Sequence, residues 1–324
     1  MHRLASRAVT VLFASIVGIA LCGQGRRPQL VIFHAGSLAV PFDRIIEGFK
    51  RENPGIEVLK EVAGSRECAR KISELHKPCD ILASSDYLVI DTLLIPAFAN
   101  WDLKFATNEL TIVYGPKSRR NGEISNGNWA DLLLARDIAI GRADPNADPC
   151  GYRTILTLKL AEIYLKRPGL ADSFLRKKGQ YIRPKEVDLL ALLETGEADY
   201  VFLYRSVAEQ HGLKYLVLPD EINLKRSEFE DYYGQVSVEL DGASPRQKIV
   251  QKGSSMVYGI TIPKNPPNPE AAKKFVHYLM NEDKGLKMMR ETGQPTVVPS
   301  VCDQYGNLPE EFRRYARPAK NQGK

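Results

Sequence analysis

Small hydroxyl or thiol residues stand at three points where an apolar run gives way to a helical pattern. They are found in Gly36-Ser37, Gly64-Ser65 and Cys150-Gly151. A helix N-terminus presents unpaired backbone N–H groups and the positive end of the helix dipole, so it binds an anion without Lys or Arg. For each serine taken alone, simple N-capping is the favoured explanation. Because the two serine turns would share the C-terminal edge of one parallel sheet, we expect them to converge.

Three acidic residues, Asp144, Asp148 and Glu186, lie in or beside proline-containing segments near other expected helix starts. The loop 143–152 contains two Asp-Pro pairs, at Asp144 and Asp148, which are typical of a rigid turn that holds a carboxylate. Glu186 begins another helical stretch, where a favourable contact with the helix dipole would also explain it. Tyr204 ends an apolar strand, where its hydroxyl could donate into a cleft or the ring could simply pack. These residues are candidates for an anion site.

The elements that must position these residues alternate between strand and helix, which is typical of parallel sheets with helical crossovers. The hydrophobic pattern predicts strands over 30–33, 56–62, 80–83, 109–114, 137–140, 199–204 and 256–262. It predicts helices over 42–49, 69–75, 155–163 and 187–193, and another starting at 268. The fold class is therefore α/β.

Two such α/β units are predicted, and the last strand and helix have no sheet of their own. We expect this block to return to the first unit, so that the chain crosses between lobes twice and leaves a cleft between them. The predicted organisation is a signal at 1–22, lobe 1 at 28–112 plus 236–312, lobe 2 at 113–235, and a polar tail at 313–324.

The N-terminus resembles a secretion signal. Arg3 and Arg7 precede an uncharged stretch, 8–21, that ends at Cys22. This stretch is too short for a comfortable membrane span. Cys22 stands where a lipoprotein would be acylated, although Leu21 is bulky where a small residue is usual. We expect export to the cell surface or periplasm, with a lipid anchor at Cys22 as one alternative; stable anchoring would need a second acyl chain.

Composition limits the other functions. The chain has 324 residues and a net charge of +6 without a block of like charges, which favours a solvated surface over nucleic-acid binding. We expect a monomer. After the signal, four cysteines remain: Cys68, Cys79, Cys150 and Cys302. Export permits disulfides, and all three pairings stay open. The sequence contains no C-x-x-C spacing, and its histidines do not cluster with the cysteines, so we do not expect a zinc site.

Several phrases of the sequence resemble a known family along essentially the whole mature chain. They are residues 34–38 (HAGSL), 148–153 (DPCGYR), 183–197 (RPKEVDLLALLETGE) and 201–204 (VFLY). They are similar to the archaeal-type molybdate/tungstate-binding proteins of ABC transporters. The resemblance implies a two-lobed, type II periplasmic-binding-protein fold, with two mixed sheets flanked by helices and the ligand in the interlobe cleft. It implies tungstate or molybdate as ligand, no cofactor, and a membrane permease as partner.

The resemblance also implies a role for each candidate residue. The oxyanion would be bound by Gly36, Ser37 and Ser65 from one lobe and by Pro149, Cys150 (through its backbone) and Tyr204 from the other. Asp148 and Glu186 would reach the metal and raise its coordination from four to six. Asp144 competes with Asp148 because it has the same Asp-Pro setting.

The physical chemistry agrees with this assignment. A carboxylate that faces sulfate or phosphate in a poorly screened cleft would only repel it. A large hexavalent metal instead accepts further oxygen ligands. Three alternatives remain: a sulfate or phosphate binder, a ferric-iron binder that uses Tyr232-Tyr233, and an enzyme with Cys150 as nucleophile. The enzyme is disfavoured because no histidine stands in a motif that predicts a general base.

Overall fold

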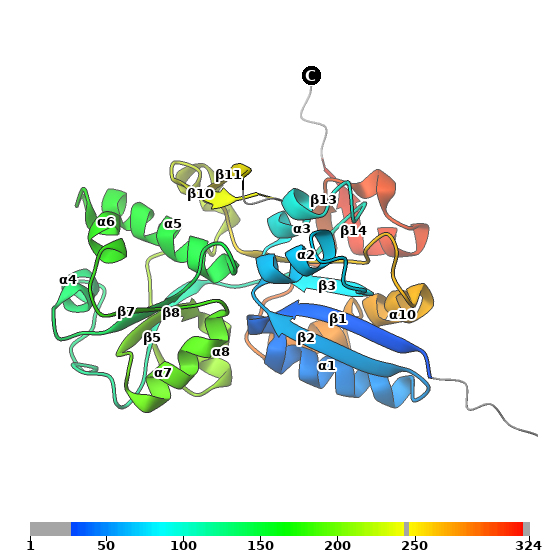
Figure 1. Cartoon of the computed structure of the whole chain (residues 1–324), viewed down its shortest axis with the longest axis horizontal. Coiled ribbons are helices and arrows are strands. Elements are labelled where there is room, and N and C mark those ends of the chain that lie inside the picture. The colour runs from blue at the N-terminus through cyan, green and yellow to red at the C-terminus, as the bar shows by residue number, and fades with distance from the viewer. Residues whose placement is uncertain (1–26, 243–245, 320–324) are drawn as a thin grey trace, which may run out of the picture.

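The computed structural model describes residues 27–242 and 246–319, which form two lobes side by side (Figure 1). Each lobe contains a five-stranded mixed sheet with helices on both of its faces. The strand order is β2-β1-β3-β12-β4 in lobe 1 and β7-β6-β8-β5-β9 in lobe 2. The expected α/β class and the two-lobed architecture with two mixed sheets are therefore confirmed.

Lobe 1 is built from two blocks of the chain. Its strands are β1 (Gln29–Ala35), β2 (Glu57–Ala63), β3 (Ile81–Ser84), β4 (Leu103–Thr107) and β12 (Val257–Thr261). Its helices are η1 (Gly36–Leu38), α1 (Ala39–Glu52), α2 (Ser65–Ser73), α3 (Tyr87–Leu93), α10 (Pro269–Leu279) and α11 (Gly285–Glu291). Leu30 and Ile32 pack against α1 and α10, whereas Phe33 packs against α2 and α3. A strand buried on both faces explains the unbroken apolar run in the sequence.

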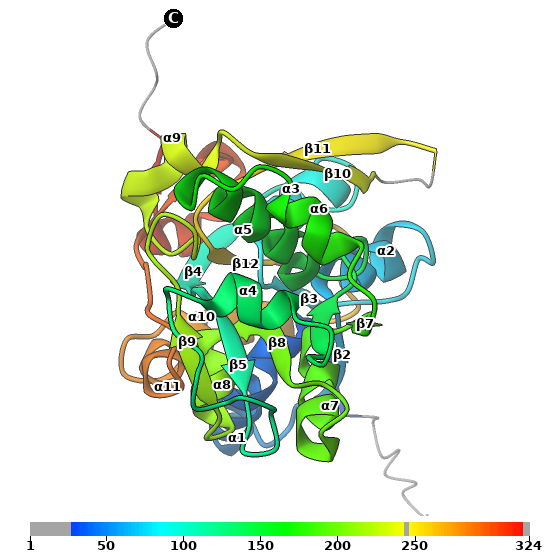
Figure 2. The same cartoon turned by 90° about the vertical axis from the view of Figure 1, so that its left-hand side faces the viewer.

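Lobe 2 repeats this architecture. Its strands are β5 (Leu110–Tyr114), β6 (Ile140–Ala143), β7 (Gln180–Arg183), β8 (Tyr200–Tyr204) and β9 (Lys214–Val217). Its helices are α4 (Trp129–Leu134), α5 (Pro149–Tyr164), α6 (Leu170–Leu175), η2 (Glu186–Asp188), α7 (Leu189–Thr195) and α8 (Arg205–Gln210). Viewed from the end of this lobe, α5 and α6 cover one face of the sheet and α7 the other (Figure 2). β6, β7 and β8 run parallel, so α5 and η2 both begin at the same edge of the sheet.

The chain first crosses between the lobes at Asn108 and Glu109, between β4 and β5. The predicted boundary after residue 112 lies too far along the chain. Leu110 and Ile112 belong to β5 and are fully buried in the core of lobe 2. The apolar run 109–114 contains a single strand of the second sheet, β5, so the lobe boundary must lie before this strand and not within it.

The chain returns to lobe 1 at β12, later than predicted. A two-stranded hairpin, β10 (Ser237–Asp241) and β11 (Lys248–Lys252), precedes β12. Val236, Leu240 and Met256 pack into the core of lobe 2. The described residues of the segment 236–256 therefore belong with lobe 2, because their apolar side chains are buried there. The short helices η3 (Ser227–Phe229) and α9 (Glu230–Tyr233) lie before the hairpin.

The segment 313–318 is folded, although the sequence predicts a polar tail from residue 313. The chain forms β13 (Ser300–Cys302), η4 (Tyr305–Asn307), η5 (Glu310–Tyr315) and β14 (Ala316–Pro318), and β14 pairs with β13. Phe312 is fully buried against Trp101 and anchors this segment to lobe 1. The signal, with Cys22, lies outside the described residues. None of the described helices is both long and apolar enough to span a membrane.

Candidate functional site

The carboxylate of Glu186, from lobe 2, lies against the start of the first helical segment of lobe 1. Its Oε1 accepts a hydrogen bond from the backbone N–H of Ser37 at 2.5 Å. A Cβ added at Gly36 would lie 2.7 Å from Oε2, so only glycine permits this approach. Glu186 is fully buried, and its Oε2 has no hydrogen-bond partner among the described residues. An unpaired buried carboxylate oxygen is costly, and it is free to become a ligand.

Asp148 is held beside Glu186 by backbone contacts. Its Oδ1 accepts from the N–H of Cys150 at 2.8 Å, which caps α5, and its Oδ2 accepts from the N–H of Glu186 at 3.2 Å. Burial, and then the neighbouring charge of Glu186, raise the pKa of Asp148 well above its ordinary value. The structure therefore brings two carboxylates together in a site shut off from solvent.

The two Asp-Pro pairs have different surroundings. Asp144 is partly exposed, and its Oδ1 accepts from the N–H of Asn146 at 2.8 Å, so it stabilises the turn. Asp148 alone of the two touches Glu186. Pro149, expected among the oxyanion-binding residues, starts α5 and has no N–H to donate. The geometry therefore favours Asp148 over Asp144 and gives Pro149 a structural role at the helix start.

The hydroxyls of Ser65 and Tyr204 are linked through two further residues, Ser85 and Arg153. Ser65 Oγ lies 3.1 Å from Ser85 Oγ and accepts from the N–H of Ser85 at 3.0 Å. Arg153 Nη1 donates to the carbonyl of Ser85 at 2.7 Å and to the hydroxyl of Tyr204 at 3.0 Å. Ser65 is thus tied within lobe 1, and Tyr204 is tied through Arg153 to the opposite lobe.

Sequence reasoning missed a buried ion pair that joins the lobes. Arg153 Nη2, from α5, lies 3.1 Å from Asp86 Oδ2 at the start of α3, and both side chains are about 2% exposed. Tyr152 donates to the same carboxylate at 2.5 Å. The signal was present: Arg153 is a charged residue within the first ten residues of α5, 149–158, which are all buried and otherwise uncharged. Arginine is almost never fully buried unless it is paired with an acidic or other hydrogen-bonding group.

The lobes touch closely beside this ion pair. A Cβ added at Gly64 would lie 2.3 Å from the carbonyl oxygen of Ala147, so a side chain there would force the lobes apart. The N–H of Glu67 donates to the same carbonyl at 3.1 Å. The structure is therefore in a closed arrangement, and lobe opening must break these contacts.

The side chains on which the enzyme and iron-binding alternatives depend are buried and engaged in other contacts. Cys150 Sγ is fully buried and lies 3.5 Å from the carbonyl of Phe202, and burial raises its thiol pKa well above the ordinary value. Such a thiol is not a nucleophile at neutral pH. Tyr233 is buried in the core of lobe 2 and its hydroxyl donates to the carbonyl of Asp220, so this hydroxyl is already engaged and does not support the iron-binding alternative. The four cysteines of the described residues are all buried and free.

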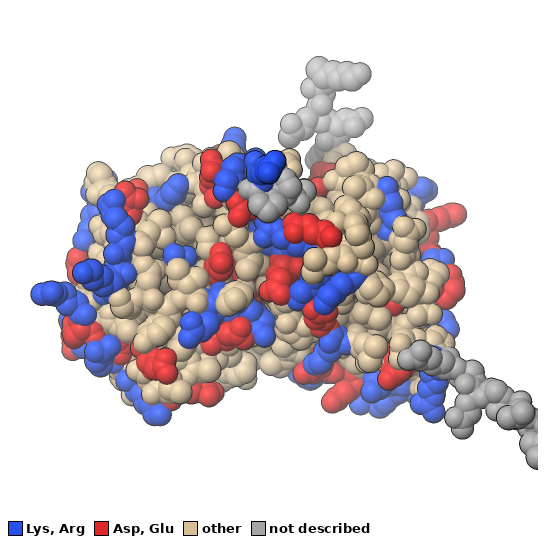
Figure 3. Space-filling view, viewed as in Figure 1, with Lys and Arg blue, Asp and Glu red and all other residues tan. Residues whose placement is uncertain are grey.

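Charge outside the site gives no further indication of a ligand. Acidic and basic side chains are mixed over the face seen in Figure 3, without a continuous patch of one sign. The described residues hold no group of three or more His, Cys, Asp or Glu placed to bind a metal ion. The candidate site therefore rests on the two buried carboxylates and the backbone N–H groups beside them.

Comparisons with known proteins identify the family. The sequence profile of the family described as "Bacterial extracellular solute-binding protein" matches residues 30–293. An uncharacterized solute-binding protein of Petrotoga mobilis is 41% identical over 316 residues, which cover 96% of this chain and 97% of the relative. A molybdate/tungstate-binding protein of Pyrococcus abyssi is 38% identical over 339 residues, covering 96% of each chain.

Solved structures support the fold. The periplasmic molybdate-binding protein of Azotobacter vinelandii superposes with a TM-score of 0.61 at 16% identity. The match covers 83% of this chain and 99% of that protein. At this identity the similarity establishes a shared architecture and leaves the ligand to be argued from the site.

Proposed function

Because this chain belongs to the family of bacterial extracellular solute-binding proteins, we propose that it captures tungstate or molybdate outside the cell and delivers it to the membrane permease of an ABC importer. The relative from Pyrococcus abyssi, at 38% identity, carries a name that states this ligand pair. We expect no catalysis and no cofactor. We also propose that the protein acts as a monomer.

One observation carries the proposal: Glu186 Oε1 and Asp148 Oδ1 both sit on backbone N–H groups at helix starts, those of Ser37 and Cys150. Such N–H groups are the natural donors to an oxyanion. Carboxylates at the same place would repel sulfate, which has no vacant position on sulfur. Molybdenum and tungsten are larger and accept more oxygen ligands.

We propose that both carboxylates become ligands of the metal when the oxyanion binds, which makes the metal six-coordinate. The unpaired Oε2 of Glu186 supports this role, because a positive centre would satisfy an oxygen that otherwise has no partner. Ser37 and Ser65 would bind oxyanion oxygens from lobe 1, and Tyr204 from lobe 2. The N–H groups now occupied by carboxylates would be released to the oxyanion.

Attachment to the membrane is a separate proposal that rests on the sequence alone. A lipid on Cys22 would keep the protein near its permease, and labelling cells with a radioactive fatty acid tests it. Incorporation into the wild type but not into Cys22→Ala is expected. A soluble, unlabelled wild-type protein would contradict it.

Calorimetric titration with tungstate, molybdate, sulfate and phosphate tests the proposed function. We expect strong binding of the first two and weak or undetectable binding of the others. Glu186→Gln should weaken tungstate binding at least about tenfold, because a charge-assisted contact contributes roughly 1.5–3 kcal/mol, and should narrow the preference over sulfate. Glu197→Gln, an exposed change of the same charge, is the matched control. Equal affinity of the wild type for sulfate and tungstate would refute the proposal.

A further inference from the structure

A chain of hydrogen bonds runs from the peptide that joins the lobes to the hydroxyl of Ser37. Asn108 Nδ2 donates to the hydroxyl of Tyr258 at 2.9 Å, and this hydroxyl lies 3.0 Å from Ser37 Oγ. Asn108 is 4% exposed, Tyr258 is fully buried and Ser37 is 1% exposed. These side chains are shut off from bulk solvent. The direction of each hydrogen bond therefore determines which atom donates in the next one.

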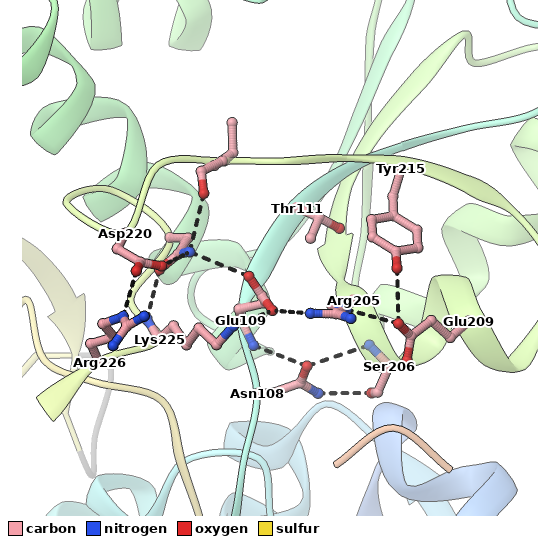
Figure 4. Close-up of polar contacts among 12 residues, drawn as sticks. Asn108, Glu109, Thr111, Arg205, Ser206, Glu209, Tyr215, Asp220, Lys225 and Arg226 are labelled. Atoms are coloured by element: carbon pink, nitrogen blue, oxygen red, sulfur yellow. Dashed lines mark hydrogen bonds and ion pairs between the residues drawn. The ribbon is translucent and has the colours of Figure 1, made fainter. Parts of the chain in front are cut away.

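The orientation of the Asn108 amide is fixed by its other contacts. Its Oδ1 accepts from the N–H groups of Glu109 at 3.0 Å and Ser206 at 3.4 Å, and its Nδ2 donates to Ser206 Oγ at 2.8 Å (Figure 4). A flipped amide would turn its NH₂ group toward two N–H donors. The nitrogen, which can only donate, must therefore face Tyr258.

This orientation sets the direction of the remaining bonds. The oxygen of Tyr258 accepts from Asn108, so its single proton is left for Ser37 Oγ. Burial raises the pKa of Tyr258 to about 12, which keeps that proton in place. Ser37 Oγ then accepts, and no acceptor for its own proton is found among the hydrogen bonds of the described residues. The hydroxyl is left as a donor beside the N–H that Glu186 occupies.

We propose that Asn108 and Tyr258 are positioning residues that hold the Ser37 hydroxyl as an obligatory hydrogen-bond donor to a fully deprotonated oxyanion. Tungstate and molybdate carry only acceptor oxygens, so the hydroxyl is presented in the state that they require. This inference rests on the proposed function, because it needs the oxyanion to contact Ser37. It also couples the site to the crossing between the lobes, because Asn108 lies within that crossing.

Asn108→Asp tests the direction of these hydrogen bonds, because aspartate has nearly the same shape as asparagine. An oxygen replaces the amide nitrogen, so Tyr258 donates to position 108 and no longer donates to Ser37; its oxygen is then left to accept the proton of Ser37. The serine proton then turns away from the ligand. We expect tungstate affinity to fall about ten- to hundredfold, the effect of losing one hydrogen bond to a charged group. Ser37→Ala should cause a loss of similar size.

A double-mutant cycle separates this mechanism from the effect of the added charge. In the Ser37→Ala background, Asn108→Asp should cause no further loss, because the hydroxyl that it reorients is already gone. Tyr258→Phe adds no charge; it should weaken binding by only about threefold, and this loss should also vanish in the Ser37→Ala background.

Calorimetry of the full chain with tungstate distinguishes failure of the positioning role from failure of the proposed function. If the wild type binds tungstate and the losses from position 108 and position 37 multiply, the positioning role is overturned while the proposed function stands. The same conclusion follows if Tyr258→Phe retains its full effect without the serine hydroxyl. If the wild type itself does not bind tungstate, the proposed function and this inference are both overturned.

Discussion

The backbone N–H of Glu186 donates to Oδ2 of Asp148 at 3.2 Å. The two acidic residues are 38 positions apart in the sequence, and this contact ties the start of η2 to the start of α5. Both segments follow strands of the same parallel group, β6 and β7, so the sheet itself brings the carboxylates together. The site is a consequence of the parallel strand order in lobe 2.

The choice between Asp144 and Asp148 can be settled by substitution. Asp148→Asn should lower tungstate affinity at least about tenfold, because it removes a buried carboxylate that lies against Glu186. Asp144→Asn should change affinity by less than about threefold, because Asp144 contacts the turn at Asn146 and is partly exposed. Calorimetry of both variants is the measurement. The reverse ranking would move the ligand role to Asp144.

The buried ion pair between Arg153 and Asp86 should hold the closed arrangement. Arg153→Gln leaves the Asp86 carboxylate buried without its cation, which costs on the order of 3–5 kcal/mol. We expect weaker tungstate binding and, in small-angle X-ray scattering with tungstate present, a larger radius of gyration than that of the wild type. Arg176→Gln breaks an exposed ion pair, Arg176–Asp172, and is the matched control. A compact, tightly binding Arg153→Gln protein would show that closure does not depend on this pair.

Much of the fold could be predicted from the sequence because the apolar runs are long and the turns are marked by glycine and proline. Leu30 to Phe33 and Asp199 to Tyr204 predict buried strands that the structure contains. The lobe boundaries were predicted less well. Val236 and Met256 are apolar residues whose pattern does not say which lobe buries them. Only packing decides that question.

The site could be predicted in part. Ser37, Asp148 and Glu186 stand in phrases that resemble a known family, and the structure places them together. Asn108 and Tyr258 could not be predicted, because each is an ordinary polar residue in a strand end or a linker. Their role depends on hydrogen-bond direction across 150 residues of sequence, which no local pattern encodes.

The pH dependence of stability should report a buried acid that is not among the candidate site residues. Burial, and then the charge of Asp91, raise the pKa of Asp102 to about 8. The unfolded chain ionises Asp102 near its ordinary pKa while the folded chain keeps the proton, so this residue makes stability fall as pH rises from about 4 to about 8. The contribution is at most about 1.4 kcal/mol per pH unit.

Asp102→Asn mimics the protonated acid and should remove this contribution. Its melting temperature should exceed that of the wild type by an amount that grows between about pH 4 and about pH 8. Thermal unfolding followed by circular dichroism measures the difference, with Asp172→Asn at an exposed position as control. A difference that stays constant or shrinks with pH would mean that Asp102 is ionised in the folded protein.

The central claim is that the ligand is an oxyanion whose metal takes carboxylates into its coordination shell. X-ray absorption of the molybdate or tungstate complex measures that shell directly. We predict an octahedral set of oxygen neighbours in the wild type and a lower coordination number in Glu186→Gln. A tetrahedral metal in the wild-type complex, unchanged by Glu186→Gln, would contradict the claim.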